Sequence, residues 1–307
     1  MKSSFKYIAA AAGLGVGSLF ISVALSQAQE GGRPEIILHK PNPHQGFAPT
    51  AGSTSTQSPP IINHGGLVLG SPTVYLIWYG DWNQSNNTDT PGGQNIVRTF
   101  LGGLGGSSYY QINKSYVIPS GTFGVGPETA DGYSQGKNLS DAGVQAVVKS
   151  ALSSGKLPVD PNGVYFVLTS SDVAESSGFC SNYCGWHTYG SISSANIKYA
   201  FVGNASRCLN ACAAQTVGPN GNAGVDGMIS VIAHELEEAN TDPNLNAWFD
   251  RRGSENADKC AWTFGQNLIK APNGAYYNLA LAGGNFLVQR NLNAKDSRCY
   301  VSADGLQ

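Results

Sequence analysis

Short apolar runs alternate with helical patterns along the chain from about residue 66 onward. β-Branched and aromatic residues dominate 73–80 (TVYLIWYG), 163–170 (GVYFVLTS) and 197–204 (IKYAFVGN). Runs of this length that are apolar on both faces favour buried strands. Residues 285–292 (NFLVQRNL) predict a last strand near the end of the chain.

Three segments between these runs carry apolar residues at helical spacing. Thr90 is a candidate N-cap for the first helix, with Pro91 at its first helical position. Ser140 is the candidate cap of the second. Residues 226–240 (DGMISVIAHELEEAN) predict a third helix, which must end before Pro243.

The alternation of strands and helices predicts a single α/β or α+β domain over residues 66–307. We expect it to be loop-rich, with a central mixed sheet flanked by helices. The length of 307 residues allows either two domains or one large one, and we find no internal repeat. Residues 29–65 are rich in Pro, Gly, Ser and Thr, which indicates a mostly disordered linker or an arm lying on the surface.

Residues 1–28 have the pattern of a secretory signal peptide. Lys2 and Lys6 precede an apolar stretch over 8–25, and a small-x-small cleavage site ends at Ala28. The alternative is an uncleaved membrane anchor, but the stretch is rich in Gly and Ala. No later segment is long and apolar enough to span a membrane, so we expect a secreted protein with no stable membrane span after cleavage.

The composition supports an extracellular location and excludes one class of partner. Charged residues make up only 12% of the chain, Gly is abundant at 39 residues, and the formal net charge is −2. This mixture suits a loop-rich extracellular protein with much β-structure. No basic stripe is present, so we expect no nucleic-acid binding.

Six cysteines follow the predicted signal peptide, at positions Cys180, Cys184, Cys208, Cys212, Cys260 and Cys299. An even number in an exported chain favours disulfides, and the sequence leaves all 15 pairings of six cysteines open. The two Cys-x3-Cys pairs also suggest zinc, but thiols oxidise outside the cell. We therefore predict a disulfide-stabilised domain.

The third predicted helix contains the main candidate for chemistry, the sequence VIAHELEEANTDP. It resembles the zinc-protease motif His-Glu-x-x-His, with Glu238 in place of the second His. His234 and Glu238 are four residues apart and share one helix face, while Glu235 points about 100° away, where a general base would lie. Zinc accepts His nitrogen and carboxylate oxygen at similar distances, so the replacement is chemically allowed.

An ordinary acidic helix is the alternative interpretation, because acidic faces are usually solvated and paired with Lys or Arg. Here the pairing is missing: from Asp226 to Asp250 there are six acidic residues and no Lys or Arg. The apolar residues before His234 also indicate that the first half of the helix is buried. Buried carboxylates repel one another unless a cation or protons intervene.

A third metal ligand must come from outside the helix. Asp258 and Glu255 lie downstream in NAWFDRRGSENADKCAW, and a disulfide at Cys260 would hold that loop in place. Asp242 and Asp250 are weaker choices, and Asp242, which precedes Pro243, is well placed to cap a turn.

His187 lies beside two cysteines in GFCSNYCGWH and could enter the same cleft. An ordinary His flanked by aromatic residues is the favoured interpretation there.

Taken together, these segments resemble the exordium family, also called phosphate-induced proteins. The matching segments, in chain order, are SPTVYLIWYGDW, GVYFVLTSSDV, GFCSNYCGWH, YAFVGN, GVDGMISVIAHELEEANTDPNLNAWFD, ENADKC and FLVQRNLN. The resemblance implies an exordium-like domain over 66–307 and a secreted or cell-wall location, since the family is best known from plant growth and cell expansion. It implies no established reaction.

The resemblance places the family's His-Glu-x-x-Glu on His234, Glu235 and Glu238, and its acidic stretch before a Cys on Glu255 and Asp258. This chain has Asp-Pro after the helix where plant members often have Asn-Pro. It also has CAW where they tend to have Cys-Glu-Gly. These departures weaken any transfer of substrate.

Two function hypotheses follow. In the first, the protein is a secreted zinc-dependent hydrolase acting on peptides: His234, Glu238 and either Asp258 or Glu255 hold zinc, and Glu235 transfers the proton. In the second, it is a non-enzymatic extracellular or cell-wall-associated protein with a structural ion or none. Loops such as 79–87 (YGDWNQSNN) would then contact polysaccharide or peptide. No serine-hydrolase elbow, phosphate loop or dinucleotide fingerprint is present.

Overall fold

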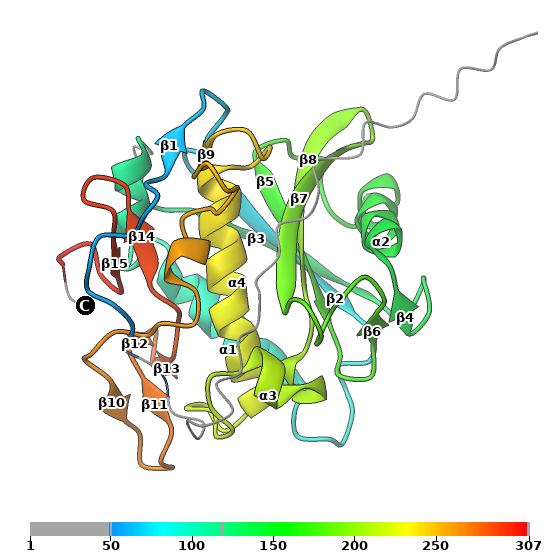
Figure 1. Cartoon of the computed structure of the whole chain (residues 1–307). Helices are drawn as coiled ribbons and strands as arrows, with labels where there is room; N and C mark the ends of the chain where they lie inside the picture. Colours follow the sequence, from blue (N-terminus) through cyan, green and yellow to red (C-terminus); the bar gives the residue numbers. More distant parts are fainter. Residues whose placement is uncertain (1–48, 50, 118–119, 306–307) are drawn as a thin grey trace, which may run out of the picture.

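The computed structural model describes residues 49, 51–117 and 120–305. The predicted signal peptide, residues 1–28, lies outside the described residues, as does most of the predicted linker. The central sheet has the strand order β3-β2-β5-β8-β7 (Figure 1). Its strands are β2 (Thr73–Tyr79), β3 (Gly124–Asp131), β5 (Gly163–Thr169), β7 (Gly185–Ile192) and β8 (Ala195–Val202). The first four in spatial order run parallel and β7 is antiparallel to β8, so the predicted mixed sheet is confirmed.

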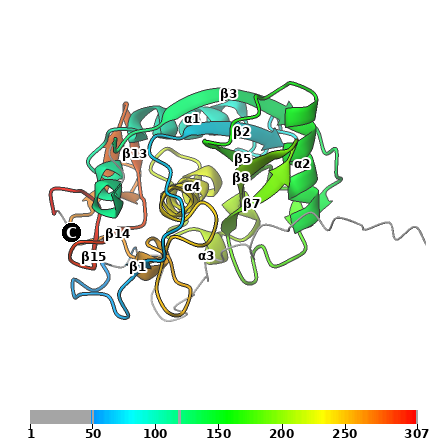
Figure 2. The same ribbon diagram turned by 90° about the horizontal axis from the view of Figure 1, so that it is seen from above.

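Helices cover both faces of this sheet (Figure 2). The helical segments are α1 (Pro91–Leu104), α2 (Asp141–Ser153), α3 (Leu209–Cys212) and α4 (Ala223–Thr241), with short 3-10 turns η1 (Tyr110–Tyr116), η2 (Ala205–Arg207) and η3 (Asp258–Cys260). One face carries α2, and the other carries α1 and α4. Both predicted caps are confirmed, since Thr90 Oγ1 and Ser140 Oγ accept hydrogen bonds from backbone N–H groups in the first turns of α1 and α2.

The remaining strands form small antiparallel or parallel pairs. These are β1 (Ile62–Asn63) with β9 (Trp248–Phe249), β4 (Asn138–Leu139) with β6 (Ala174–Glu175), β10 (Ile269–Lys270) with β11 (Tyr276–Tyr277), β12 (Leu279–Leu281) with β13 (Gly284–Phe286), and β14 (Asn291–Asn293) with β15 (Arg298–Tyr300).

The single strand predicted over 285–292 is wrong, because the segment divides between β13 and β14. The residues between them bond to side chains and loops rather than to a strand. Val288 N–H donates to Asn278 Oδ1, and Gln289 N–H donates to Ser230 Oγ on α4. The apolar run is therefore a connection that lies against α4.

The strands β7 and β8 form a hairpin that places an edge strand beside α4. Ser193 and Ser194 link them with positive φ angles of 52° and 62°, the conformation that two-residue hairpin turns require. The pattern of β7 mixes polar and aromatic residues, and the sequence did not predict it. Alternation along β7 directs Gly185 and His187 toward α4, since a Cβ at Gly185 would meet Val231 of that helix.

Helix α4 is buried along nearly its whole length. The sheet lies on one side of it and the C-terminal small strands lie on the other (Figure 1). The sequence predicted burial for only the first half of the helix. Glu235, Glu237 and Glu238, in the second half, are all completely buried. Carboxylates in such a position need hydrogen bonds, protons or a cation.

Residues 51–65, from the predicted linker or arm, lie against the domain. Ile61 is buried, and β1 pairs with β9 in register. The carbonyl oxygen of Pro59 accepts a hydrogen bond from Lys259 Nζ at 2.8 Å, and that of Ser53 accepts one from Arg290 Nη2 at 2.9 Å. The folded domain therefore has contacts with residues that precede position 66.

All six cysteines form disulfides, as predicted. The pairs are Cys180–Cys208, Cys184–Cys212 and Cys260–Cys299. The first two join the segment that leads into β7 to the region of α3, and the third joins η3 to β15. All three disulfides therefore hold elements that contact α4.

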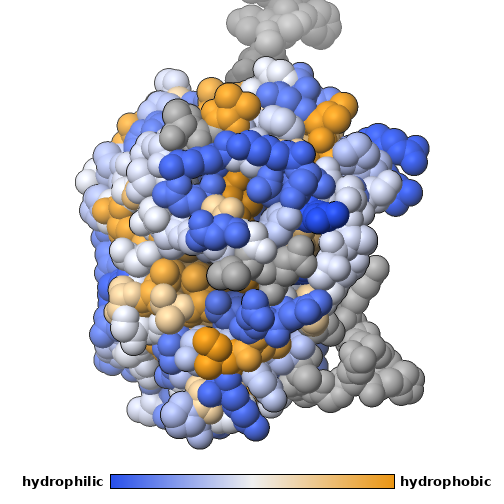
Figure 3. Space-filling model, turned by 90° about the vertical axis from the view of Figure 1, so that its left-hand side faces the viewer, coloured by the Kyte–Doolittle hydropathy of each residue, from blue (hydrophilic) through white to orange (hydrophobic). Residues whose placement is uncertain are grey.

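In the described part of the chain, no helix is both long enough and apolar enough to cross a bilayer. Figure 3 shows the side formed by the C-terminal small strands. Its apolar residues lie in several groups separated by hydrophilic ones.

Candidate metal centre

His234 and Glu238 lie one turn apart on α4 and face each other. Nε2 of His234 is 2.9 Å from Oε1 of Glu238, and both side chains are completely buried. Despite this short distance, neither ring nitrogen of His234 has a hydrogen-bond partner among the described residues. The imidazole and the carboxylate thus lie close together, but their relative orientation is not that of a hydrogen bond.

Asp258 approaches the same pair from η3. Its Oδ1 is 3.6 Å from His234 Nε2, and its backbone N–H donates a 3.0 Å hydrogen bond to Glu238 Oε1. The donor atoms of His234, Glu238 and Asp258 all lie within 4.8 Å of one another. Because Cys260 is bonded to Cys299, the turn that carries Asp258 is covalently fixed.

Glu255, the other proposed third ligand, lies elsewhere in the cluster. Its Oε2 is 3.1 Å from Nε2 of His187, and its backbone N–H donates to Asp258 Oδ2 at 3.1 Å. The structure therefore brings Asp258 to His234 and brings Glu255 to His187.

His187 and Glu235 form a second group with Glu238. Their donor atoms also lie within 4.8 Å of one another, and His187 Nε2 is 3.9 Å from Glu238 Oε2. The sequence favoured an ordinary role for His187, but the structure places it among the acidic residues. The alternation of β7 would have given the signal, had the strand been recognised.

The first group fits a zinc ion. Zinc–ligand distances of about 2.0–2.2 Å in tetrahedral geometry put neighbouring ligand atoms roughly 3.4 Å apart. The two distances from His234 Nε2, 2.9 Å to Glu238 and 3.6 Å to Asp258, lie on either side of that value. The unpartnered ring nitrogens of His234 and the unpartnered Oε2 of Glu238 also match a cation better than a network of hydrogen bonds.

Burial raises the pKa of both glutamates in the centre. The pKa of Glu238 rises to about 7, against the attraction of the His234 ring. Burial, together with the Glu238 charge, raises the pKa of Glu235 well above its usual range. Both oxygens of Glu235 also lack a hydrogen-bond partner among the described residues. A cation in the cluster would reverse these shifts.

The pKa values of the two histidines are shifted in opposite directions. Burial lowers the pKa of His187 to about 3, with the His234 charge acting in the same direction, so His187 is neutral at physiological pH. Burial also opposes the charging of His234, but Glu238 and Asp258 outweigh it and raise its pKa well above the ordinary value. A neutral His187 has the protonation state that metal ligation requires.

The two weaker candidates have structural roles. Asp242 Oδ1 accepts hydrogen bonds from the N–H groups of Asn246 and Ala247, both at 2.6 Å, as expected for a turn cap. Asp250 pairs with Lys259 at 2.6 Å.

Glu237 is a buried carboxyl group that the sequence reasoning did not single out. Its Oε2 accepts a 2.9 Å hydrogen bond from Asn291 Nδ2, and burial raises its pKa well above the usual range. It belongs to neither metal-ligand group. In the sequence, only its position between Glu235 and Glu238 would have drawn attention to it.

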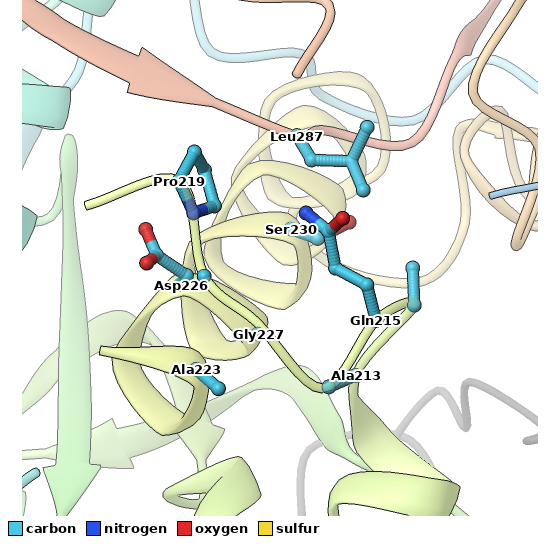
Figure 4. A pocket seen from close by; sticks show the side chains of 10 residues that line it. Ala213, Gln215, Pro219, Ala223, Asp226, Gly227, Ser230 and Leu287 are labelled. Atoms are coloured by element: carbon cyan, nitrogen blue, oxygen red, sulfur yellow. The ribbon is translucent and has the colours of Figure 1, made fainter. Parts of the chain in front are cut away.

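A hollow lies beside α4 (Figure 4). Its lining includes Gln215, Pro219, Asp226, Ser230 and Leu287. Asp226 and Ser230 come from the first half of α4, whereas Glu238 lies near the other end. The Asp226 carboxylate is already engaged by the backbone and side-chain N–H groups of Asn220.

Residues 61–302 match the conserved region of phosphate-induced protein 1. Protein EXORDIUM-like 3 of Arabidopsis thaliana is 33% identical over 269 residues, an alignment that covers 73% of this chain and 77% of the relative. Protein EXORDIUM-like 5 of the same plant is 30% identical over 283 residues, covering 77% and 76%. Protein PHOSPHATE-INDUCED 1 of Nicotiana tabacum is 28% identical over 263 residues, covering 70% and 78%. No solved structure matches the chain.

Proposed function

The chain belongs to the exordium and phosphate-induced protein family, and from this premise we propose that it is a secreted, zinc-dependent hydrolase that acts on peptides. Three disulfides support the extracellular location, because such bonds persist in oxidising compartments. The proposal for the reaction rests on the buried centre on α4.

One observation carries the proposal: His234, Glu238 and Asp258 converge, and the His234 ring nitrogens and Glu238 Oε2 are buried without a hydrogen-bond partner among the described residues. Burying such groups without partners costs free energy, about 1–3 kcal/mol for each polar group. A divalent cation among them offsets that cost and attracts the carboxylates.

In this proposal His234, Glu238 and Asp258 hold zinc. The ion supplies Lewis acidity toward a substrate carbonyl and toward water. Glu235 takes the proton from the attacking water and passes it to the leaving amine, as a general base and then a general acid. Its two oxygens are free of hydrogen bonds in the described structure, so either can accept the proton.

A second candidate is an exported binding protein in which the same ion is structural. The burial of the centre favours it, since His234, Glu235 and Glu238 are each 0% exposed. Structural zinc sites are closed, whereas catalytic sites keep one position open. In the loop proposed for polysaccharide contact, Tyr79 and Trp82 are both buried, so their rings are not available for stacking on sugars.

The test is the metal content of the mature protein, measured by mass spectrometry beside His234→Ala. His64→Ala is the matched control, because His64 is exposed, stacks on Phe249 and belongs to neither group of candidate ligands. We expect zinc in the wild type and in the control, and a loss in His234→Ala. Equal and negligible metal in all three would end the proposal.

Cleavage of a peptide library with and without chelator separates the two candidates. Chelator-sensitive cleavage supports the hydrolase. A metal that raises thermal stability while no peptide is cleaved supports the binding protein instead.

A further inference from the structure

We propose that Glu238 bridges two divalent cations, the second of which is held by His187 and Glu235. This inference rests on the proposed metal centre and extends it to a two-ion site. The second site draws on β7 and on the loop of Glu255, not on the His-Glu-x-x-Glu motif alone.

The two oxygens of Glu238 face different groups. Oε1 lies 2.9 Å from His234 Nε2 and accepts the N–H of Asp258. Oε2 lies 3.9 Å from His187 Nε2 and has no hydrogen-bond partner among the described residues. The carboxylate is completely buried, so its unpartnered oxygen is directed into the protein. This is the arrangement of a carboxylate that bridges two ions.

A single ion does not account for both imidazoles. His234 and His187 fall in two separate groups of mutually close donor atoms, and the groups share only Glu238. Two ligands of one zinc ion are at most about 4.2 Å apart, twice the metal–ligand distance. Paired ions in hydrolases lie about 3.5–4 Å apart, a span that one carboxylate bridges.

Charge balance also favours two ions. Glu235, Glu238, Glu255 and Asp258 carry four negative charges when ionised, and one divalent cation would leave two of them uncompensated in a buried site. No Lys or Arg of the described segments forms an ion pair with Glu235 or Glu238. Two divalent cations neutralise the four carboxylates while both imidazoles stay neutral.

Glu255 supplies a fourth donor for the second ion. Its Oε2 and His187 Nε2 form a 3.1 Å hydrogen bond, a spacing close to the separation of about 3.4 Å expected for two ligands of one tetrahedral ion, so an ion held by both would replace this bond. Glu235 binds through one oxygen, and its second oxygen still accepts a proton. The ligand role of Glu235 is thus compatible with the base role proposed above.

Metal counting with zinc tests this inference. The full mature protein is saturated with zinc sulfate, freed of loose ions by gel filtration, and counted by mass spectrometry beside His187→Ala, His187→Asn, His234→Ala and the control His64→Ala. We expect two zinc ions in the wild type and the control, and one in either His187 variant. Near-ultraviolet circular dichroism checks that each variant is folded.

The outcomes distinguish this inference from the proposed function. One zinc in the wild type and one in the His187 variants, with none in His234→Ala, overturns the second site and leaves the first intact. Two zinc ions in both the wild type and the His187 variants also overturn it. No zinc in the wild type ends both proposals.

A crystal of the zinc-loaded wild type gives a test that needs no variant. Anomalous scattering at the zinc edge should show two peaks about 3.5–4 Å apart, one on each side of Glu238. A single peak between His234 and Asp258 would contradict the inference.

Discussion

The backbone N–H of Asp258 donates a 3.0 Å hydrogen bond to Oε1 of Glu238, a residue 20 positions earlier in the chain. The turn η3 therefore fixes the orientation of a carboxylate that α4 carries into the interior. The same turn brings the Asp258 side chain to His234. The centre thus depends on two elements, and each can be perturbed separately.

We predict that Glu238→Gln abolishes metal binding without loss of the fold. The amide keeps an oxygen that can accept the Asp258 N–H, but it lacks the charge that attracts a cation. Zinc affinity should fall at least about 100-fold, beyond the effect usual for a supporting residue. Isothermal titration with zinc measures it. Glu128→Gln is the control, because Glu128 is half-exposed and pairs with Arg98; equal affinities in both variants would contradict the assignment.

The stability of the metal-free protein should fall as the pH rises toward neutrality. Burial raises the pKa of Glu238 to about 7, so the folded state binds this proton more tightly than the unfolded state does. Its contribution is complete below the unfolded pKa of 4.5 and is lost as the pH rises through about 7. The loss is about 3 kcal/mol, since one pKa unit corresponds to about 1.4 kcal/mol.

Urea unfolding between about pH 5 and about pH 8, with chelator and with zinc, measures this effect. Zinc competes with the proton, so the gain in stability from zinc should grow with pH. Burial also raises the pKa of Asp226 to about 6. Asp226 therefore also lowers the stability as the pH rises, with or without the metal. Parallel pH curves in the two conditions would show that Glu238 is not a ligand.

Much of the fold followed from local patterns. The strands β2, β5 and β8 are apolar on both faces because helices cover both sides of the sheet, and the caps Thr90 and Ser140 have local hydrogen-bonding roles. The edge strand β7 was not predicted, because its residues mix polar and aromatic types. The apolar run at 285–292 was assigned wrongly, because burial against α4 produces the same pattern as a strand.

Part of the candidate site could be predicted from the sequence for a similar reason. The spacing of His234 and Glu238 is a property of one helix, so the sequence alone brings them together. The placement of Asp258 beside His234 and of Glu255 beside His187 depends on how η3 and the residues before it fold. The position of His187 depends on the register of β7 with β8. Such tertiary relationships are not fixed by the spacing of residues within one element.

If Glu235 is the general base, Glu235→Gln should lose hydrolysis. Removing a positioned base lowers kcat by about 10²- to 10⁴-fold, with little change in KM. The first zinc site, which does not contain Glu235, should still fill. Steady-state kinetics on a cleaved library peptide, with zinc counted in the same sample, makes the measurement. Unchanged kcat would exclude Glu235 as the base.

Gly185→Ala should destabilise the contact between β7 and α4. A Cβ at this position would lie 2.6 Å from Val231 Cγ1 and 2.7 Å from the carbonyl oxygen of Phe201, so backbone or helix must shift. Overpacking of this kind costs about 1–3 kcal/mol. Gly102→Ala in α1 is the control: nothing lies within 4 Å of the added carbon, and alanine favours the helix. Urea midpoints that move together in both variants would contradict the packing argument.

Removal of the Cys260–Cys299 disulfide should affect both stability and metal binding. Replacing both cysteines with Ser frees a link between residues 39 positions apart and costs about 2–4 kcal/mol. It also loosens η3, so Asp258 is less well placed and zinc affinity should fall about 10- to 100-fold. Calorimetry gives the affinity, and urea unfolding gives the stability.

The matched control is the double replacement of Cys180 and Cys208, whose residues are 28 positions apart. Because loop entropy depends weakly on length, this variant should lose similar stability, yet η3 stays fixed and zinc affinity should be retained. Equal losses of affinity in the two double variants would mean that zinc responds to overall stability, not to the placement of Asp258. A loss confined to the Cys260–Cys299 pair would show that the covalent anchor of η3 holds the third ligand in position.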